Sequence, residues 1–307
     1  MALRALVTSL FILLLAIAPA AQAADVALVL SDTSGAYSEF ATALQQYSEA
    51  SNWRVRWTGS VDNFEAAPRT DLIITVGSEA TRAVLQRGVP APVMATLLPR
   101  PAYERALADA GGGRSRGSTT AIFLDQPVSR LLAFTRHLLP ERHRIGVLAG
   151  NDTRAMLPHI RQAAGAAGLA LEVEELENNA NPVPAVNHLL TRSDVLLALP
   201  DSAVYRRDNI RAILLTSYRF QRPVIGFSQS LVTSGALAGI YSTPTQIARQ
   251  AMDIMKGLRP EALALPAPQA PAFFAIAVNH NVAQALGLTL PDEPSIRRAL
   301  AADKDAR

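Results

Sequence analysis

The 307-residue sequence contains no cysteine. This absence excludes disulfide bonds, thiolate metal sites and catalytic thiols together. It also removes the cysteine that a lipoprotein needs beside the cleavage site of its leader. We therefore expect neither thiol chemistry nor attachment through a lipidated cysteine.

Lysine is almost as scarce, because Lys256 and Lys304 are the only two among 29 basic residues. With 26 acidic residues the formal net charge is +3, and no run of five or more like charges occurs. The arginine excess is therefore too small and too scattered to form a basic stripe. The composition does not indicate a nucleic-acid partner.

Long apolar runs are confined to the first residues. Met1 to Ala23 has one charge, Arg4, then an apolar run from about Ala5 to Ala18 and an Ala21-Gln22-Ala23 pattern. This order is typical of a secretory signal that is cleaved after Ala23, with an uncleaved membrane anchor as the alternative. No later stretch is long and apolar enough to span a bilayer. We expect an exported protein of the periplasm.

The common sequence signatures of enzymes are missing as well. There is no G-x-G-x-x-G, no G-x-x-x-x-G-K-[ST], no H-E-x-x-H and no G-x-S-x-G. None of the five histidines pairs with another at metal-ligand spacing, and no two carboxylates are marked as an acid and a base. We predict no catalytic residue, no metal site and no cofactor.

The sequence does contain apolar runs that alternate with helix-like segments. We predict strands at 26–30, 53–58, 72–76, 92–97, 145–148, 171–176, 195–199, 224–227 and 273–278. We predict helices at 37–50, 128–139, 156–167, 184–190, 209–220, 245–258 and 281–286. One more helix is predicted to follow the third strand and to end at about residue 86. The charged residues at the end of the chain are expected to be frayed.

These elements predict an α/β fold with two Rossmann-like lobes. Several strands are apolar without interruption, which is typical of parallel sheets covered by helices on both faces. The glycine-rich segment Ala110 to Ser118 interrupts the alternation, which then restarts, so we place a boundary between lobes near Ser118–Ala121. About 280 residues after the signal suit two lobes. Trp53 and Trp57 share a strand-like segment and are expected to pack on a sheet face.

Three strand ends share one design, in which an apolar strand runs through a turn of small or capping residues into a helix. The turns are Gly77-Ser78-Glu79, Gly150 to Thr153 and Pro200-Asp201-Ser202, and Ser31 to Ser34 follows the first strand similarly. The unpaired N–H groups and positive dipole of a helix start attract anions such as carboxylates. Ordinary N-caps are the alternative interpretation of each turn.

The order of several short motifs resembles a known family. They are "VALVLSDTS", "DLIITVGSEATRAV", "LLPERHRIGVLAGNDT", "DVLLALPDSAV", "RPVIGFSQSLVTSGALAGI" and "VNHNVAQALGLTLPD". Together they cover nearly all of the predicted mature chain. The chain is similar to the ABC-transporter substrate-binding proteins whose better-known members bind tryptophan, tyrosine or phenylalanine.

The resemblance implies the type I periplasmic-binding-protein fold, with a ligand cleft between two lobes joined by three crossings. We place these crossings near Ser118–Ala121, Ile240–Thr243 and Ala270–Phe273. The first lobe would comprise residues 24–119 and 242–271, and the second lobe residues 120–241 and 272–307. The helix at 245–258 would return to the first lobe, and the strand at 273–278 would join the second.

The resemblance also implies an amino acid or a similar small carboxylate as ligand and a membrane permease as partner of a monomeric protein. Ser78, with Thr81 and the amides of Gly77–Glu79, would hold a carboxylate, and Asp201 or Asp152 would meet an ammonium group. The implied ligand-binding residues are Ser31, Asp32, Thr33, Ser34, Gly77, Ser78, Glu79, Thr96, Asn151, Asp152, Thr153, Asp201, Ser202, Ser228 and Gln229.

Two segments depart from the family pattern. Tyr241-Ser242-Thr243-Pro244 has one aromatic residue and no glycine where the family usually has an aromatic-rich segment before a glycine. The connection from 97 to 118 replaces a tighter turn. Two other functions therefore stay open: a ligand-sensing module that docks on an inner-membrane receptor, and a hydrolase or isomerase on the same fold.

Overall fold

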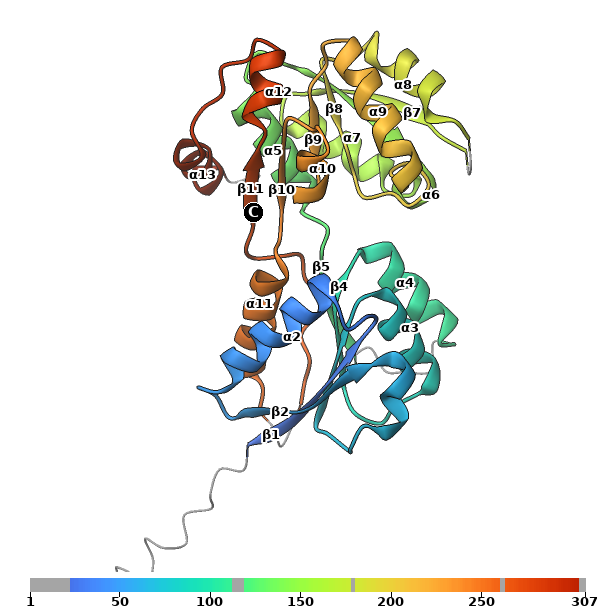
Figure 1. Cartoon of the computed structure of the whole chain (residues 1–307), viewed down its shortest axis with the longest axis vertical. Coiled ribbons are helices and arrows are strands. Elements are labelled where there is room, and N and C mark those ends of the chain that lie inside the picture. The colour runs from blue at the N-terminus through green and yellow to red at the C-terminus, as the bar shows by residue number, and fades with distance from the viewer. Residues whose placement is uncertain (1–22, 112–118, 178–179, 260–262, 304–307) are drawn as a thin grey trace, which may run out of the picture.

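The computed structural model describes residues 23–111, 119–177, 180–259 and 263–303. The predicted signal, apart from Ala23, and residues 112–118 of the glycine-rich segment lie outside the described residues. No helix within these described ranges is long and apolar enough to cross a membrane. The described residues form two α/β lobes, one above the other in Figure 1.

The first lobe is built on a fully parallel sheet with the strand order β2-β1-β3-β4-β5. Its strands are β1 (Ala24–Leu30), β2 (Trp53–Ser60), β3 (Leu72–Val76), β4 (Val93–Leu98) and β5 (Thr119–Phe123). Its other elements are α2 (Gly35–Ser48), the 3₁₀ helix η1 (Val61–Ala66), α3 (Ser78–Arg87), α4 (Arg100–Asp109) and α11 (Pro244–Gly257). The three inner strands β1, β3 and β4 are buried almost throughout, which explains their continuous apolar sequences.

Each face of this sheet has its own helices. Alternate residues of β1 point to opposite faces: Val26 and Leu28 pack with α2 and α11, whereas Ala27 and Val29 pack with η1, α3 and α4. The helix predicted at 245–258 thus lies against α2 of the first lobe (Figure 1).

The second lobe contains six strands in the order β11-β10-β9-β8-β6-β7. They are β6 (Arg144–Ala149), β7 (Ala170–Glu175), β8 (Val195–Leu197), β9 (Val224–Gly226), β10 (Ala238–Tyr241) and β11 (Ala275–Val278). Its helices are α5 (Val128–Leu138), α6 (Asn151–Arg154), α7 (Leu157–Ala166), α8 (Pro182–Leu190), α9 (Arg207–Arg219), α10 (Gln229–Thr233), α12 (His280–Ala285) and α13 (Glu293–Ala302). The sheet is parallel except for β11, which runs antiparallel to β10.

The sequence-based prediction missed several of these elements. Strands β5 and β10 were not predicted, nor were α4 and α10. The expectation of a frayed end was wrong for α13, because Asp292 caps its first turn through the amide of Ser295, and Ile296 and Leu300 bury its inner face. This helix packs against α5.

Within the described residues the chain passes between the two sheets three times. The first crossing, 124–127, follows β5, and the second, 242–243, joins β10 to α11. The third, 270–274, leads from Gln269, which pairs with Ile122 at the edge of the first sheet, to β11. Because β5 pairs with β4 as far as Phe123, the chain leaves the first sheet later than Ser118–Ala121. We propose a lobe limit after Phe123.

A buried hydrogen-bond network ties the three crossings together. The Ser242 hydroxyl accepts a hydrogen bond from Gln126 Nε2 at 2.8 Å and donates to the Phe273 carbonyl at 2.5 Å. Arg130, on α5, donates to Gln126 Oε1 and to the Pro271 carbonyl, each at 2.8 Å. Burial lowers the pKa of the Arg130 guanidinium below its usual value. The crossings therefore form one connected hinge rather than three independent linkers.

Trp53 joins α11 to the first sheet and allows a matched test of that packing. Its indole Nε1 donates to the Met255 carbonyl at 2.8 Å, whereas Trp57 donates no hydrogen bond within the described residues. We predict that Trp53→Phe lowers the free energy of unfolding by about 1 kcal/mol, because the Met255 carbonyl loses one of its two donors and keeps only the Leu258 amide. Trp57→Phe should lower the free energy of unfolding by distinctly less. Urea denaturation of both variants checks this, and equal losses would contradict the assigned role.

Candidate functional site

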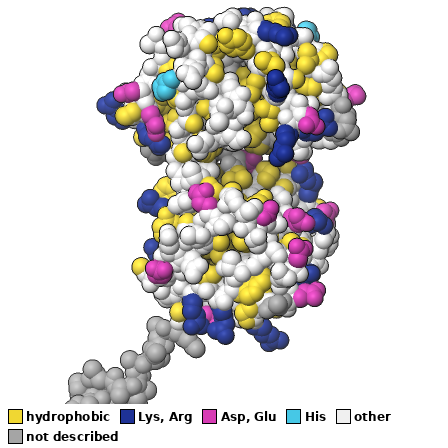
Figure 2. Space-filling view, viewed as in Figure 1, with side chains coloured by type: hydrophobic (Ala, Val, Ile, Leu, Met, Phe, Trp, Pro, Cys, Tyr) yellow, Lys and Arg dark blue, Asp and Glu magenta, His cyan; other side chains and the backbone are white. Residues whose placement is uncertain are grey.

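The carboxyl ends of the two sheets face each other across the hinge. Strands β5 and β10 both run directly into crossings, so both sheets turn the same edge toward the waist of the molecule (Figure 1). Figure 2 shows that the surface narrows there and that basic and acidic side chains are interspersed on this side. In such open sheets ligands bind beyond the carboxyl ends, where the strand order reverses. These points are the turns after β1 and β3 and after β6 and β8.

In the first lobe, Gly77 and Ser31 shape the start of α3. Gly77 has φ +96°, and a Cβ atom there would lie 2.5 Å from Ser31 Oγ. Ser31 Oγ in turn accepts a hydrogen bond from the Ala80 amide at 2.9 Å. The N–H groups of Ser78 and Glu79 have no acceptor within the described residues, and both side chains are exposed. This helix start can therefore offer two amides and a hydroxyl to an anion.

Other predicted residues of the first lobe have internal roles. Thr96 is fully buried, and its hydroxyl donates to the Thr75 carbonyl, so it lies within the lobe rather than at its surface. Thr81 is also fully buried and donates to the Gly77 carbonyl. Asp32 Oδ1 accepts hydrogen bonds from the amide and hydroxyl of Ser34, which closes a local turn. Asp32, Thr33 and Ser34 are all exposed at the carboxyl edge.

In the second lobe, Asp201 orders two loops. Its Oδ2 atom accepts hydrogen bonds from the amides of Gly150 (3.1 Å) and Thr153 (2.9 Å). Its Oδ1 atom accepts from the amides of Ala203 (3.0 Å) and Val204 (3.3 Å). The residue is 4% exposed. The carboxylate is thus fully engaged with backbone donors, and we assign it a positioning role instead of contact with an ammonium group.

Asp152 connects the lobes. Its Oδ1 atom lies 2.8 Å from Arg105 Nη1 on α4, and its Oδ2 atom accepts from the amide (3.0 Å) and hydroxyl (2.6 Å) of Ser202. Partial burial acts to raise the pKa of the Asp152 carboxyl, but the hydrogen bonds from Ser202 and Arg105 outweigh it, so the pKa lies below its usual value. Asp152 and Arg105 form an ion pair that spans the space between the lobes.

The remaining predicted residues of the second lobe lie at the same edge. Ser228 Oγ accepts from the Leu231 amide and caps α10, and Gln229 Oε1 accepts a hydrogen bond from the Tyr241 hydroxyl at 3.1 Å. Thr153 is buried beneath the turn, whereas Asn151 is exposed. Some polar groups at this edge are therefore engaged in hydrogen bonds within the protein, whereas a few others face solvent.

Several residues at this edge were not predicted from the sequence. Asp125 lies in the first crossing and accepts a hydrogen bond from the Arg100 amide. Burial raises the pKa of its carboxyl, and the charge of Asp152 acts in the same direction, although Arg100 opposes both. Tyr205 and Phe227 follow β8 and β9 and meet edge to face, with ring centroids 5.5 Å apart. The position of Phe227 directly after β9 was an available signal, whereas Tyr205 lies in the loop between β8 and α9 and had none.

The Tyr205 hydroxyl is buried and has no hydrogen-bond partner within the described residues. Burial raises the pKa of this phenol. In the first lobe, a groove of about 390 Å³ between α3 and α4 is lined by Ser78, Glu79 and Arg105 among others. The two lobes thus present different chemistry: exposed amides and charge on the first, and an aromatic pair on the second.

Comparisons with solved structures agree on the architecture. An L-tryptophan complex of an ABC domain from Streptococcus pneumoniae is 14% identical, with a TM-score of 0.60, and the match covers 89% of this chain and 98% of that one. A ligand-free, open substrate-binding protein from Clostridium difficile is 16% identical, with a TM-score of 0.67 and coverage of 89% and 97%. A conserved domain protein from Vibrio cholerae is 20% identical, with a TM-score of 0.62 and coverage of 90% and 98%.

Two facing, mainly parallel sheets joined by three crossings define a two-lobed binding protein of the periplasmic type I fold. A sequence profile described as ABC transporter substrate binding protein matches residues 61–300, and the chain belongs to this family. Its members are solute-binding proteins rather than enzymes, act with a membrane permease, and are typically extracellular or periplasmic. No curated protein sequence matches the chain.

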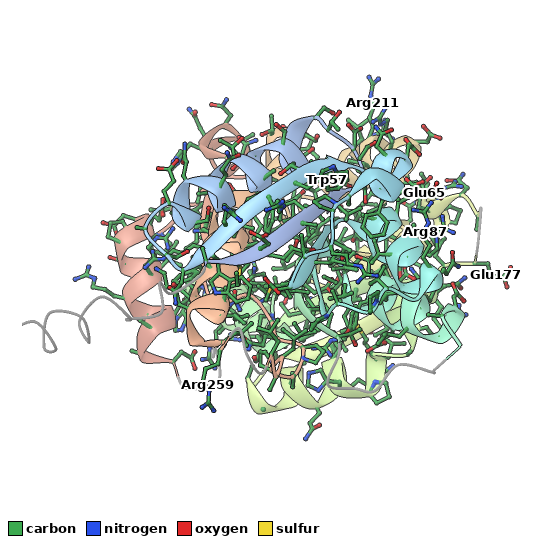
Figure 3. All side chains as sticks on the ribbon, turned by 90° about the horizontal axis from the view of Figure 1, so that it is seen from below. Trp57, Glu65, Arg87, Glu177, Arg211 and Arg259 are labelled. Atoms are coloured by element: carbon green, nitrogen blue, oxygen red, sulfur yellow. The ribbon has the colours of Figure 1, made fainter. Side chains whose placement is uncertain are left out.

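Asp201→Asn tests the positioning role of that carboxylate. An amide side chain retains one acceptor but turns an NH₂ group toward backbone donors, so we predict a loss of at least about 2 kcal/mol in the free energy of unfolding. The exposed Glu177, seen at the periphery in Figure 3, provides a control. Glu177→Gln should change stability by less than about 0.5 kcal/mol. Equal stability of both variants in chemical denaturation would contradict the assignment.

Arg105→Gln tests the ion pair between the lobes. Because Arg105 is exposed, the pair should contribute about 0.2–1 kcal/mol, and its loss should shift the ratio of open to closed molecules by up to about fivefold. Spin-label distances between the lobes measure this ratio. Arg154→Gln, which removes an exposed pair with Glu175 inside the second lobe, should leave the distances unchanged.

Lowering the pH should change the ratio of open to closed molecules in the same direction as the Arg105→Gln substitution. Because the pKa of Asp152 is lowered in the folded protein, the pair's contribution is present above the ordinary carboxyl pKa of about 3.9 and is lost as pH falls through the lowered value. The same label distances should therefore change in that acidic window in the wild type and hardly at all in Arg105→Gln. A wild-type transition near neutral pH would contradict this cause.

Proposed function

We propose that the protein binds an amino acid or a similar small carboxylate between its lobes and delivers it to an ABC permease. The observation that supports this most directly is the start of α3, where the amides of Ser78 and Glu79 have no acceptor within the described residues. This is a ten-residue helix whose dipole adds to the attraction for a carboxylate.

Asp125 and Asp152 are the groups we assign to an ammonium group. They approach from the hinge and from the second lobe, and the charge of Asp152 adds to the burial that raises the pKa of the Asp125 carboxyl. A ligand ammonium between them would relieve this repulsion and lower the raised pKa of Asp125. This assignment replaces Asp201, which is 4% exposed and whose two oxygens already accept four backbone hydrogen bonds. Asp152 accepts from Arg105 and Ser202 but is only partly buried.

An apolar ligand side chain would contact the aromatic pair. Tyr205 and Phe227 are each partly exposed at the carboxyl edge of the second sheet, and Leu124 in the first crossing is 36% exposed. L-Tryptophan is bound by the pneumococcal ABC domain, whereas another neighbour, 11% identical with a TM-score of 0.54, is a periplasmic ribose ABC transporter from Conexibacter woesei. The charges around α3 and the hinge favour the amino-acid class here.

The proposed delivery requires export. The signal predicted over residues 1–23 would direct the chain to the periplasm, where the permease in the inner membrane receives the ligand. Closure of the lobes about the hinge would enclose the ligand before transfer. A thermal-shift screen of amino acids and small carboxylates is the first experiment, and no shift with any of them would contradict the proposed ligand class.

Ser78→Pro and Ser78→Ala form a matched pair that separates the amide from the hydroxyl. Proline is well tolerated at the first position of a helix, and Gly77 has ψ 167°, which a following proline permits. Ser78→Pro removes the free N–H and should weaken the affinity for an amino acid from that screen about tenfold or more. Ser78→Ala should have a smaller effect.

Isothermal titration calorimetry measures both affinities, and circular dichroism confirms that α3 remains folded. Unchanged affinity in Ser78→Pro would show that the carboxylate does not bind at this helix start. It would leave the family assignment intact and reject the proposed site.

A further inference from the structure

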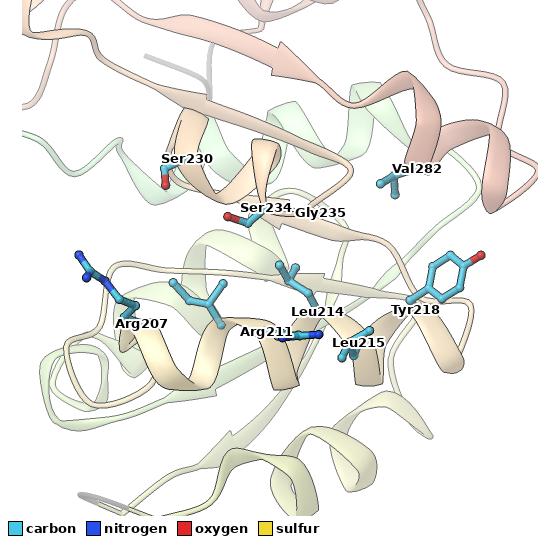
Figure 4. A pocket seen from close by; sticks show the side chains of 10 residues that line it. Arg207, Arg211, Leu214, Leu215, Tyr218, Ser230, Ser234, Gly235 and Val282 are labelled. Atoms are coloured by element: carbon cyan, nitrogen blue, oxygen red, sulfur yellow. The ribbon is translucent and has the colours of Figure 1, made fainter.

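A groove on the outer side of the second lobe has no role in the proposed solute binding. It lies between α9 on one side and α10 and α12 on the other, and its volume is about 810 Å³ (Figure 4). We name it the α9 groove and define it by Arg207, Arg211, Leu214, Leu215 and Tyr218 on α9. The opposite wall is formed by Ser230, Ser234 and Gly235 at α10 and by Val282 on α12.

The α9 side of the groove combines exposed apolar area with free positive charge. Leu215 and Tyr218 are 49% and 48% exposed, and Phe220 directly after α9 is 37% exposed. Leu124 is the remaining large apolar side chain of such exposure within the described residues. Exposed apolar side chains that gather on one helix are typical of an interaction surface.

Arg207 and Arg211 stand one helical turn apart at this groove. Neither forms an ion pair within the described residues, although nine other arginines do. Figure 3 shows Arg211 projecting away from the body of the protein. Two unpaired guanidinium groups therefore border an apolar floor, and a partner with carboxylates at matching spacing would neutralise them.

We propose that the α9 groove docks an acidic amphipathic helix of another protein. On such a helix, carboxylates at positions i and i+4 would meet Arg211 and Arg207, and apolar side chains further along the same face would contact Leu215 and Tyr218. The α9 helix has 13 residues, which is about 20 Å, and therefore matches about three to four turns of a partner helix. The small side chains of Ser230, Ser234 and Gly235 leave room for it.

Charge disfavours the most obvious alternative, a symmetric dimer through this groove. Two copies joined in that way would place four unpaired arginines together, which costs free energy unless acids intervene. The partner is therefore a different, acidic surface. Solute binding between the lobes is a separate activity, so the proposal does not rest on the identity of that ligand.

A designed peptide tests the chemistry of the groove. The probe is a helical peptide of about 14 residues with two glutamates one turn apart and leucines on the same face. Fluorescence anisotropy should show saturable binding, and the double variant Arg207→Glu with Arg211→Glu should weaken it about tenfold or more. A peptide with lysines in place of the glutamates should then bind the double variant.

Two further variants separate groove binding from general attraction. Ser234→Trp fills the groove without changing charge and should abolish binding, while Arg161→Glu, on the exposed side of α7, changes charge elsewhere and should alter affinity by less than about twofold. Binding that survives Ser234→Trp, or that falls equally in Arg161→Glu, overturns the proposal. Binding to anionic lipid vesicles that depends on Arg207 and Arg211, without peptide binding, overturns it in favour of a membrane surface.

Site-specific photocrosslinking in cells identifies the natural occupant. A photoreactive residue at Leu215 should yield a product with an acidic amphipathic helix, and the product should disappear in the double arginine variant. The same residue at Glu177 serves as the control position. Failure to obtain an arginine-dependent product, or a calorimetric loss of solute affinity in the double variant, overturns the groove as an independent docking surface.

Discussion

The hydroxyl of Ser242 connects the three crossings on which the two-lobed arrangement depends. It accepts a hydrogen bond from Gln126 in the first crossing, belongs to the second, and donates to Phe273 in the third. Because Ser242 and Gln126 are buried, an unpaired group here would cost more than an exposed one. Arg130 extends the same network to Pro271. These contacts keep the carboxyl edges of both sheets opposed, and small rotations at such element ends are how two-lobed proteins close.

The opposed edges divide the polar groups into two kinds. Asp201, Ser31 and Thr96 are used within their lobes: Asp201 and Ser31 accept amides at the starts of α6 and α3, and Thr96 joins β4 to β3. Ser78 is exposed and Asp152 is partly buried at the two edges, the first offering amides and the second a carboxylate held by Arg105. The positioning groups thus give the exposed groups a fixed geometry before any ligand arrives, which lowers the entropy cost of binding.

Much of this fold is predictable from the sequence because the inner strands are buried on both faces. The strand predicted at 72–76 matches β3 (Leu72–Val76), and the helix predicted at 128–139 matches α5 to within one residue. Strand β5 was missed because its short run, Thr119–Phe123, follows directly on the glycine-rich segment, whose composition indicated a boundary. The antiparallel pairing of β11 depends on contacts with β10, which no local pattern records.

The candidate site was predictable in position but not in the role of each residue. Strand ends and helix starts marked the turns that lie at the carboxyl edge of each sheet, since their small and capping residues are visible in the sequence. Whether a carboxylate faces the ligand or its own backbone is decided by folding: Asp201 and Asp152 have similar sequence surroundings, yet the first accepts four amides and the second pairs with Arg105 in the other lobe. Asp125 carried no signal, because its importance comes from the hinge.

We infer that a small ligand with an anionic end binds at the start of α3 between the lobes. The most direct test is the backbone amide NMR spectrum of the isotope-labelled protein, titrated with a mixture of the common amino acids. We expect saturable shifts of the Ser78 and Glu79 amides, together with shifts around Asp152 as the second lobe closes on the ligand. Saturable shifts that leave both of these helix-start amides unchanged, or no shifts at all, would contradict it.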